Sequence, residues 1–170
     1  YKVFLDLKLH DIPNTVRGAS LACATAGADL LTLHLSGGRR MAEAALEAVS
    51  KLENKPLLYG VTVLTSLEDG ELPYSKAPVG ELAREMAALG AEWGLDGVVT
   101  AGREVGQIKK QNPGLGCLVP GIRLGGEQRD DQRRVISPAM AVAAGADFLV
   151  VGRPITRAED PVAAAASIIA

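Results

Sequence analysis

The 170-residue chain contains few cysteines and few aromatic residues, and neither sign of charge is in large excess. Its two cysteines, Cys23 and Cys117, lack metal-ligand spacing, so we expect reduced, buried thiols of a cytoplasmic protein. Lys and Arg total 18 against 20 Asp and Glu, a formal charge of -2. This balance argues against a broad basic face for nucleic acid and leaves room for one local anion site.

Long apolar runs are also missing. No stretch approaches the roughly 20 residues of a membrane-spanning helix. The opening YKVFLDLKLH carries acidic and basic residues and does not resemble a secretory signal. We therefore expect a soluble protein that does not bind membranes, built as one domain over residues 1–170.

Short runs rich in Val and Leu alternate six times with amphipathic stretches. Such runs are typical of parallel strands covered on both faces, joined by right-handed helical crossovers. The predicted strands span residues 3–9, 29–35, 56–64, 97–101, 116–122 and 147–152. Polar, Gly-containing segments 66–78 and 123–134 follow strand ends, where parallel α/β proteins bind ligands.

In the stretches between these strands, apolar residues recur at the spacing of an α-helix, and single residues mark where the helices begin and end. Ser137 before Pro138 predicts a helix start, and Gly27 and Gly145 predict helix ends. The faces expected to be buried are Met41, Ala45, Ala48, Val49 and Leu52; Leu82, Met86, Leu89 and Trp93; and Val162, Ala165, Ala166 and Ile169.

Six βα units fit either an open doubly wound sheet or most of a barrel. An eight-fold barrel would need two more units, about 60 residues at about 30 per unit. A closed parallel barrel of six strands would be unusual. The sheet is therefore expected to be open or the chain incomplete.

The strongest chemical signal lies in FLDLKLHD, residues 4–11. Strand alternation places Phe4, Asp6, Lys8 and His10 on one face and apolar residues on the other. A carboxylate and an ammonium about 7 Å apart on a buried strand must be paired. A structural ion pair and a lysine held ready to donate a proton fit this pattern about equally well.

The next residues turn the chain into a helix. Pro13 sets the turn, and Asn14 or Thr15 can cap the helix. Capping does not account for Asp11, which lies three residues beyond Lys8.

A phosphate site is predicted where the last strand ends, in VVGRPIT. Gly152 allows backbone N–H groups to approach a ligand, and Arg153 supplies a planar cation. Arg123 follows the preceding strand, at the same edge. Arg133 and Arg134 are interpreted as solvated surface residues.

Other polar residues give weaker signals. His10 and His34 have no carboxylate or thiol at metal-ligand spacing, so packing or hydrogen bonding is the favoured role and no metal site is predicted. Thr65 ends the middle strand and could either bind a ligand or terminate the strand.

The segment DLKLHDIPNT, residues 6–15, closely resembles the catalytic motif of the orotidine 5'-phosphate decarboxylase family in its bacterial form. Further segments match in order over nearly the whole chain, and together they are far more specific than one motif. They are LHLSGG (33–38), VTVLTS (61–66), LDGVV (95–99), VPGIR (119–123), DQRR (131–134) and GADFLVVGRPIT (145–156).

The resemblance implies a (β/α)8 TIM barrel, a homodimer with shared active sites, and decarboxylation of orotidine 5'-monophosphate to uridine 5'-monophosphate without cofactor or metal. By the motif, Lys8 would protonate C6, and Asp6 would lie beside the substrate carboxylate. The remaining implied roles are Asp11 and Thr15 in the partner's site, Thr65 on the pyrimidine, Gln132, Gly152 and Arg153 on the phosphate, and Arg123 at the same end.

The family also uses an Asp on the first barrel strand and a Lys on the second. The six-unit chain has neither strand, so we expect the domain to be N-terminally incomplete. Two alternatives are a magnesium-dependent sugar-phosphate decarboxylase or aldolase of the same superfamily, and an inactive phosphate-binding fragment. The IPNT and DQRR segments favour the nucleotide decarboxylase.

Overall fold

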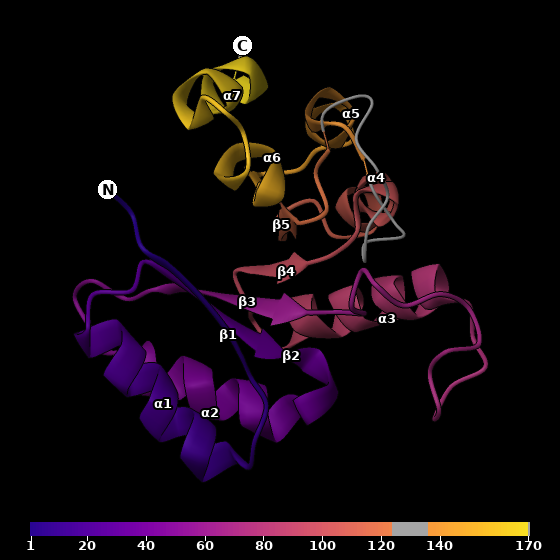
Figure 1. Ribbon diagram of the computed structural model, residues 1–170. Coiled ribbons are helices and arrows are strands. Elements are labelled where there is room, and N and C mark those ends of the chain that lie inside the picture. Colours follow the sequence, from indigo (N-terminus) through magenta and orange to yellow (C-terminus); the bar gives the residue numbers. More distant parts are fainter. Residues whose placement is uncertain (124–135, 170) are drawn as a thin grey trace.

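The computed structural model describes residues 1–123 and 136–169, and its centre is one curled parallel sheet (Figure 1). The strands follow one another in chain order, from β1 to β6. In a doubly wound sheet the order of the strands reverses part-way across the sheet. The uninterrupted order found here therefore indicates a barrel-type sheet. The strands are β1 (Phe4–Leu9), β2 (Leu30–His34), β3 (Leu57–Val61), β4 (Gly97–Val99), β5 (Gly116–Val119) and β6 (Phe148–Leu149).

All six predicted strands are confirmed, although each is shorter than its apolar run. Helices separate them, and Figure 1 shows α1 and α2 together against one face of β1–β3. The helices are α1 (Pro13–Thr25), the 3-10 turn η1 (Leu35–Gly37), α2 (Arg39–Val49), α3 (Val79–Glu92), α4 (Gly102–Gln111), α5 (Pro138–Ala143), α6 (Arg153–Thr156) and α7 (Pro161–Ile169). Within the described residues, no helix is long and apolar enough to cross a membrane.

Two apolar layers cover the two faces of the sheet, as the continuous apolar runs predict. Leu31 and Leu33 of β2 pack in the larger layer beneath the helices. Leu30 packs in the smaller layer on the inner face, with Tyr59 and Val61 of β3. This inner layer lies on the concave face of the curled sheet.

Tyr59 fills the inner layer where β4 and β5 begin. Its ring meets Phe148 edge-on, with ring centroids 6.0 Å apart, and burial raises its pKa to about 12. The ring occupies the space that side chains at two glycines would need. A Cβ atom at Gly97 would lie 2.4 Å from Tyr59 Cε1 and 2.6 Å from the Gly116 carbonyl oxygen.

Replacing Gly97 by alanine is therefore expected to lower the free energy of unfolding by about 1–3 kcal/mol, because the ring or the strand must shift. Urea unfolding followed by circular dichroism measures the change. Gly114→Ala is the matched control, since a Cβ atom there meets no neighbour within 4 Å. Equal stability of the two variants would contradict this packing.

The helix boundaries are largely those predicted. The Ser137 hydroxyl caps α5 by accepting from the Met140 N–H at 3.3 Å, and Gly27 and Gly145 end helices at φ values of 90° and 100°. The expected cap at Asn14 or Thr15 is wrong. Ile12 occupies the N-cap without a side-chain hydrogen bond, because Pro13 is the first helical residue and places both polar residues inside the first turn.

The predicted inner face of α3 is confirmed only in part. Leu89 is 41% exposed, whereas Val79, Ala83, Ala87 and Gly90 face the core. Small residues allow the helix to approach the sheet closely: a Cβ atom at Gly90 would already lie 3.3 Å from Val98. Leu82, Met86 and Trp93 therefore pack along the flank of the contact.

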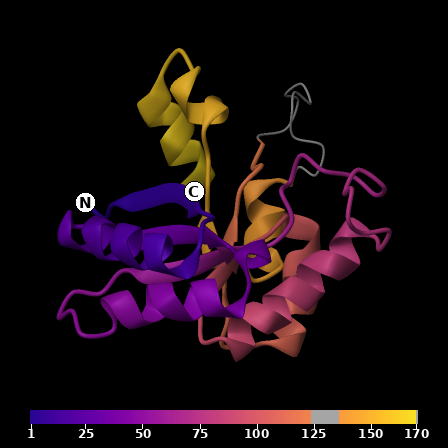
Figure 2. The same cartoon turned by 90° about the horizontal axis from the view of Figure 1, so that it is seen from below.

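The apolar face predicted for α7 is not buried by the described chain, and Val162 is 79% exposed. Figure 2 shows α6 and α7 standing away from the other helices. The helix follows β6, an edge strand of the sheet, and therefore has no further strand to cover. The Ile169 side chain lies outside the described residues. Of the two cysteines, Cys117 is buried as predicted and Cys23 is only half-buried.

Candidate active site

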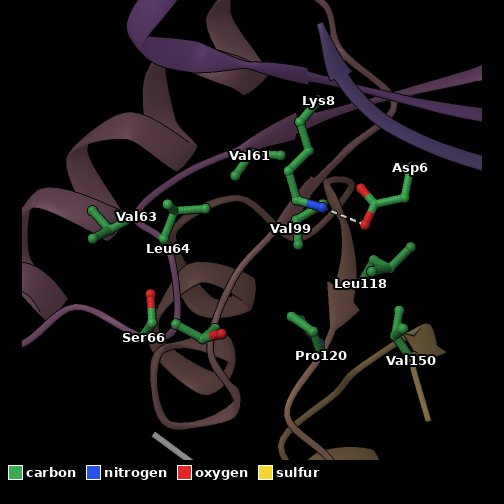
Figure 3. A pocket seen from close by; sticks show the side chains of 11 residues that line it. Asp6, Lys8, Val61, Val63, Leu64, Ser66, Val99, Leu118, Pro120 and Val150 are labelled. Carbon is green, nitrogen blue, oxygen red and sulfur yellow. Dashed lines mark hydrogen bonds and ion pairs between the residues drawn. The ribbon is translucent and has the colours of Figure 1, made fainter. Parts of the chain in front are cut away.

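A cavity of about 330 Å³ opens at the carboxyl ends of the strands, on the inner face of the sheet (Figure 3). Parallel α/β proteins place their ligands at this edge, as the sequence predicts. Its lining combines charged, hydroxyl and apolar side chains, which suits a ligand that combines a ring with charged groups. The lining residues are Asp6, Lys8, Val61, Val63, Leu64, Thr65, Ser66, Val99, Leu118, Pro120 and Val150.

Asp6 and Lys8 of β1 form an ion pair at the wall of this cavity. The Lys8 ammonium donates to Asp6 Oδ2, and Figure 3 shows the two groups facing one another. The side chains are 40% and 38% exposed, so the pair is partly desolvated and remains open to a ligand. The predicted pairing and common face of Asp6 and Lys8 are thus confirmed.

The strand is irregular at this point, which the simple alternation did not predict. Leu5 pairs with Leu31 and Leu9 with Leu33, so β1 uses four steps where β2 uses two. Lys8 has a φ of 52°, a left-handed conformation that is uncommon outside glycine. Such a conformation at a functional residue must be held by its surroundings.

The bulge changes where the neighbouring side chains lie. Leu7, expected to be buried, is 54% exposed, while Leu5 and Leu9 pack against the core beneath the helices. His10, expected on the face of Asp6 and Lys8, is not among the cavity residues. The alternation fails because the extra residues of the bulge rotate the end of the strand.

Thr32 of β2, which is not among the predicted site residues, joins the pair. Its hydroxyl donates to Asp6 Oδ1 at 2.9 Å and accepts from the Lys8 backbone N–H at 3.0 Å. The side chain is completely buried. The signal available in the sequence was a single hydroxyl within the otherwise apolar strand LLTLH.

The two histidines lie together beside this strand end. Their ring centroids are 5.2 Å apart, and the Ser36 hydroxyl lies 3.5 Å from His10 Nε2. Burial lowers the pKa of His34, as do the nearby His10 and Lys8, whereas Asp6 opposes the change. Within residues 1–123 and 136–169, no three His, Cys, Asp or Glu side chains are grouped as a metal site.

The strand-end threonines have different positions. Thr65 lines the cavity between Leu64 and Ser66. Thr62 is buried instead, and its hydroxyl donates to the Val99 carbonyl at 2.9 Å. The geometry therefore places Thr65 where a ligand can reach it and leaves Thr62 to tie β3 to β4.

Among the described residues predicted to hold phosphate, Gly152, Arg153 and Arg123 are not part of the cavity lining. Gly152 is the N-cap of α6, and Arg153 is the first residue of that helix and is partly buried. The backbone N–H of Arg123 donates to Ile136 at 3.1 Å, and its guanidinium donates to the Ile122 carbonyl at 2.8 Å. Gln132, like Arg133 and Arg134, lies outside the described residues.

Asp11 and Thr15 also lie outside the cavity of their own chain. Both are exposed, Asp11 in the turn after β1 and Thr15 in the first turn of α1. The Asp11 carboxylate accepts from the Ile12 N–H at 2.6 Å, which fixes the turn. The structure therefore brings together Asp6, Lys8 and Thr65 and separates them from Asp11 and Thr15.

Comparisons with known proteins show the family of this chain. Residues 1–168 match the model of the "Orotidine 5'-phosphate decarboxylase / HUMPS family". Orotidine 5'-phosphate decarboxylase of Nitratidesulfovibrio vulgaris strain DP4 is 56% identical, over 100% of this chain and 75% of that protein. The enzyme of Lawsonia intracellularis is 49% identical, over 99% and 76%.

A solved structure has the same fold. The crystal structure of orotidine 5'-phosphate decarboxylase from Lactobacillus acidophilus superposes with a TM-score of 0.85 at 34% identity, covering 99% of this chain and 74% of that one. The likeness extends over all six strands. The chain belongs to the orotidine 5'-phosphate decarboxylase / HUMPS family.

Proposed function

We propose that this protein decarboxylates orotidine 5'-monophosphate to uridine 5'-monophosphate in pyrimidine biosynthesis. The observation that carries the proposal is the Asp6–Lys8 pair at the cavity wall, at the carboxyl ends of the strands. The names of the relatives supply the substrate. No cofactor is part of the proposal.

Lys8 acts at the reacting carbon. When carbon dioxide leaves, negative charge develops on C6 of the pyrimidine with little resonance relief, so a fixed cation beside it lowers the barrier. The Lys8 ammonium supplies this positive charge and has a proton to deliver to C6. The apolar wall formed by Val61, Val99 and Leu118 excludes water from the ring and strengthens the interaction.

Asp6 holds the ammonium and lies beside the carboxylate that departs. One of its oxygens accepts a hydrogen bond from the Lys8 ammonium, and the other accepts one from the Thr32 hydroxyl. With both oxygens engaged, the carboxylate has a fixed orientation before substrate binds. Thr65 also lines the cavity, and in this proposal it hydrogen-bonds the pyrimidine.

Gly152 and Arg153, together with Gln132 and Arg123, form the proposed phosphate subsite. Gly152 and Arg153 begin α6, where the chain leaves β6, and Arg123 follows β5 at the same edge of the sheet. Binding energy from a phosphate remote from C6 positions the base and offsets its desolvation. A guanidinium suits this role because it donates two parallel hydrogen bonds to one phosphate.

Arg153→Ala is expected to lower kcat/KM for orotidine 5'-monophosphate by about 10–100-fold, the range for lost hydrogen bonds between charged groups. The control substrate is orotidine, which lacks the phosphate and should be turned over equally by both proteins. Both reactions are followed by ultraviolet absorbance. An equal loss of kcat/KM with both substrates would show that Arg153 does not bind the phosphate.

The proposed enzyme is a homodimer in which Asp11 and Thr15 reach into the partner's site. Both side chains are exposed and lie outside the cavity of their own chain. Ile12, between Asp11 and the start of α1, is 67% exposed, so an apolar side chain beside Asp11 is also open to contact with a second copy.

The curled sheet is proposed to be six of the eight strands of a TIM barrel. Among the described strands, β1 and β6 each have one neighbour and one open edge. Phe148 of β6 is 44% exposed beside its edge, which two further βα units would cover. By the family resemblance these units carry the additional Asp and Lys of the active site.

The test is the fall in ultraviolet absorbance of orotidine 5'-monophosphate with the full-length gene product, with EDTA and without added metal. We expect turnover that magnesium does not increase. Turnover of a sugar phosphate only when magnesium is added would instead assign the protein to the sugar-phosphate branch. Phosphate-ester binding with no turnover of either substrate would identify a binding protein.

A further inference from the structure

The Thr32 hydroxyl bonds both to the Asp6 carboxylate and to the backbone N–H of Lys8. We infer that Thr32 is a positioning residue for the decarboxylation, which sets the Asp6 carboxylate and the Lys8 backbone relative to one another. The inference rests on the proposed function. Thr32 does not line the cavity, so it acts through these two residues and not on the substrate.

The direction of both hydrogen bonds follows from the chemistry of the groups. The Lys8 backbone N–H can only donate, so the Thr32 oxygen accepts it at 3.0 Å. The hydroxyl proton is then free to donate to Asp6 Oδ1 at 2.9 Å, and an ionised carboxylate can only accept. One group thus satisfies two partners, and neither bond can reverse.

The first bond supports the bulge in β1. Between Leu5 and Leu9 the strand leaves its register with β2, and the Lys8 N–H bonds to the Thr32 side chain. A φ of 52° is an unfavourable backbone conformation for a lysine. Leaving the part-buried Lys8 N–H without a partner would add a further energetic cost. The hydroxyl therefore stabilises the conformation that turns Lys8 toward the cavity.

The second bond completes a closed set of contacts. Asp6 Oδ1 accepts a hydrogen bond from the Thr32 hydroxyl, and Asp6 Oδ2 accepts one from the Lys8 ammonium. Lys8 is consequently held at its backbone by Thr32 and at its ammonium by a carboxylate that Thr32 orients. Complete burial of the threonine keeps water from competing for either bond.

Thr32→Val keeps the size of the side chain and removes the hydroxyl. We expect kcat for orotidine 5'-monophosphate to fall by about 10²-fold, the effect of a small misplacement of a reacting group, while KM changes little. Thr32→Ser retains both bonds and should restore kcat to within about 3-fold of the wild type. Thr32→Ala is a second hydroxyl-free variant and should show the same loss of kcat as Thr32→Val.

Thr62→Val is the matched control for stability. Thr62 is also a buried threonine, on the neighbouring strand end, and its hydroxyl bonds to Val99 and not to the ion pair. We expect this variant to lose stability without losing kcat. Circular dichroism and urea unfolding of all variants separate a folding defect from a positioning defect.

The possible outcomes are distinct. Loss of kcat in the Val and Ala variants with recovery in the Ser variant supports the inference. A folded Thr32→Val or Thr32→Ala protein with wild-type kcat, or an equal loss in Thr32→Ser, overturns it. An inactive wild-type protein would instead overturn the proposed function.

Discussion

Replacing Lys8 by alanine is expected to lower kcat for orotidine 5'-monophosphate by about 10⁴-fold, the upper range for loss of a positioned general acid. The variant loses both the fixed cation beside C6 and the proton that C6 receives. It also leaves Asp6 without its counter-ion at the wall where the substrate carboxylate binds, and two like charges there weaken binding. The absorbance assay of the purified full-length protein measures the effect.

Lys2→Ala is the matched control for this experiment. Lys2 lies just before β1, is 89% exposed and pairs with Asp29, so its loss removes the same charge without altering the cavity. We expect its kcat and KM to equal those of the wild type. A Lys8→Ala protein that retained more than about a tenth of wild-type kcat would show that another group protonates C6.

Pairing two inactive chains is expected to restore activity. Asp11→Ala should be as impaired as Lys8→Ala if each site uses Lys8 of one chain and Asp11 of its partner. In a heterodimer of the two variants, one site contains both substitutions and the other contains neither. Heterodimers should therefore recover about half of the wild-type activity, as expected for one intact site in two.

The heterodimer is isolated by co-expressing the variants with different affinity tags and purifying on both. Lys8→Ala paired with Lys8→Ala by the same route is the control, and it should remain inactive because neither site has its ammonium. A heterodimer no more active than this control would place Asp11 outside the partner's site. A protein that elutes as a monomer at assay concentration would contradict the shared-site proposal directly.

Much of the fold was predictable because its signals are local. Each strand is a short apolar run, and each is present close to its expected position. The Asp6–Lys8 pair was predictable for the same reason, since two residues separated by one position on a strand share a face. Ser137 begins a helix, and Gly27 and Gly145 end helices, through conformational preferences of single residues.

The helix faces show where local patterns become insufficient. Hydrophobic periodicity predicted that the large side chains of α3 face the sheet, but the residues buried there are the small Ala83, Ala87 and Gly90. The choice depends on how closely the helix can approach Val98 and Leu35, and this distance is a property of both surfaces. The exposed face of α7 likewise depends on which strand lies beneath it.

The sequence by itself determined six strands, the ligand-binding edge and the pair of charges that faces it, because each depends on residues close together in the chain. Only the tertiary structure decided the bulge at Lys8, the departure of His10 from the cavity and the contact with Thr32. Thr32 lies 26 positions from Asp6, and the register of β2 against β1 decides whether its hydroxyl reaches the carboxylate. Register is set by the packing of the whole sheet, so no local pattern encodes it.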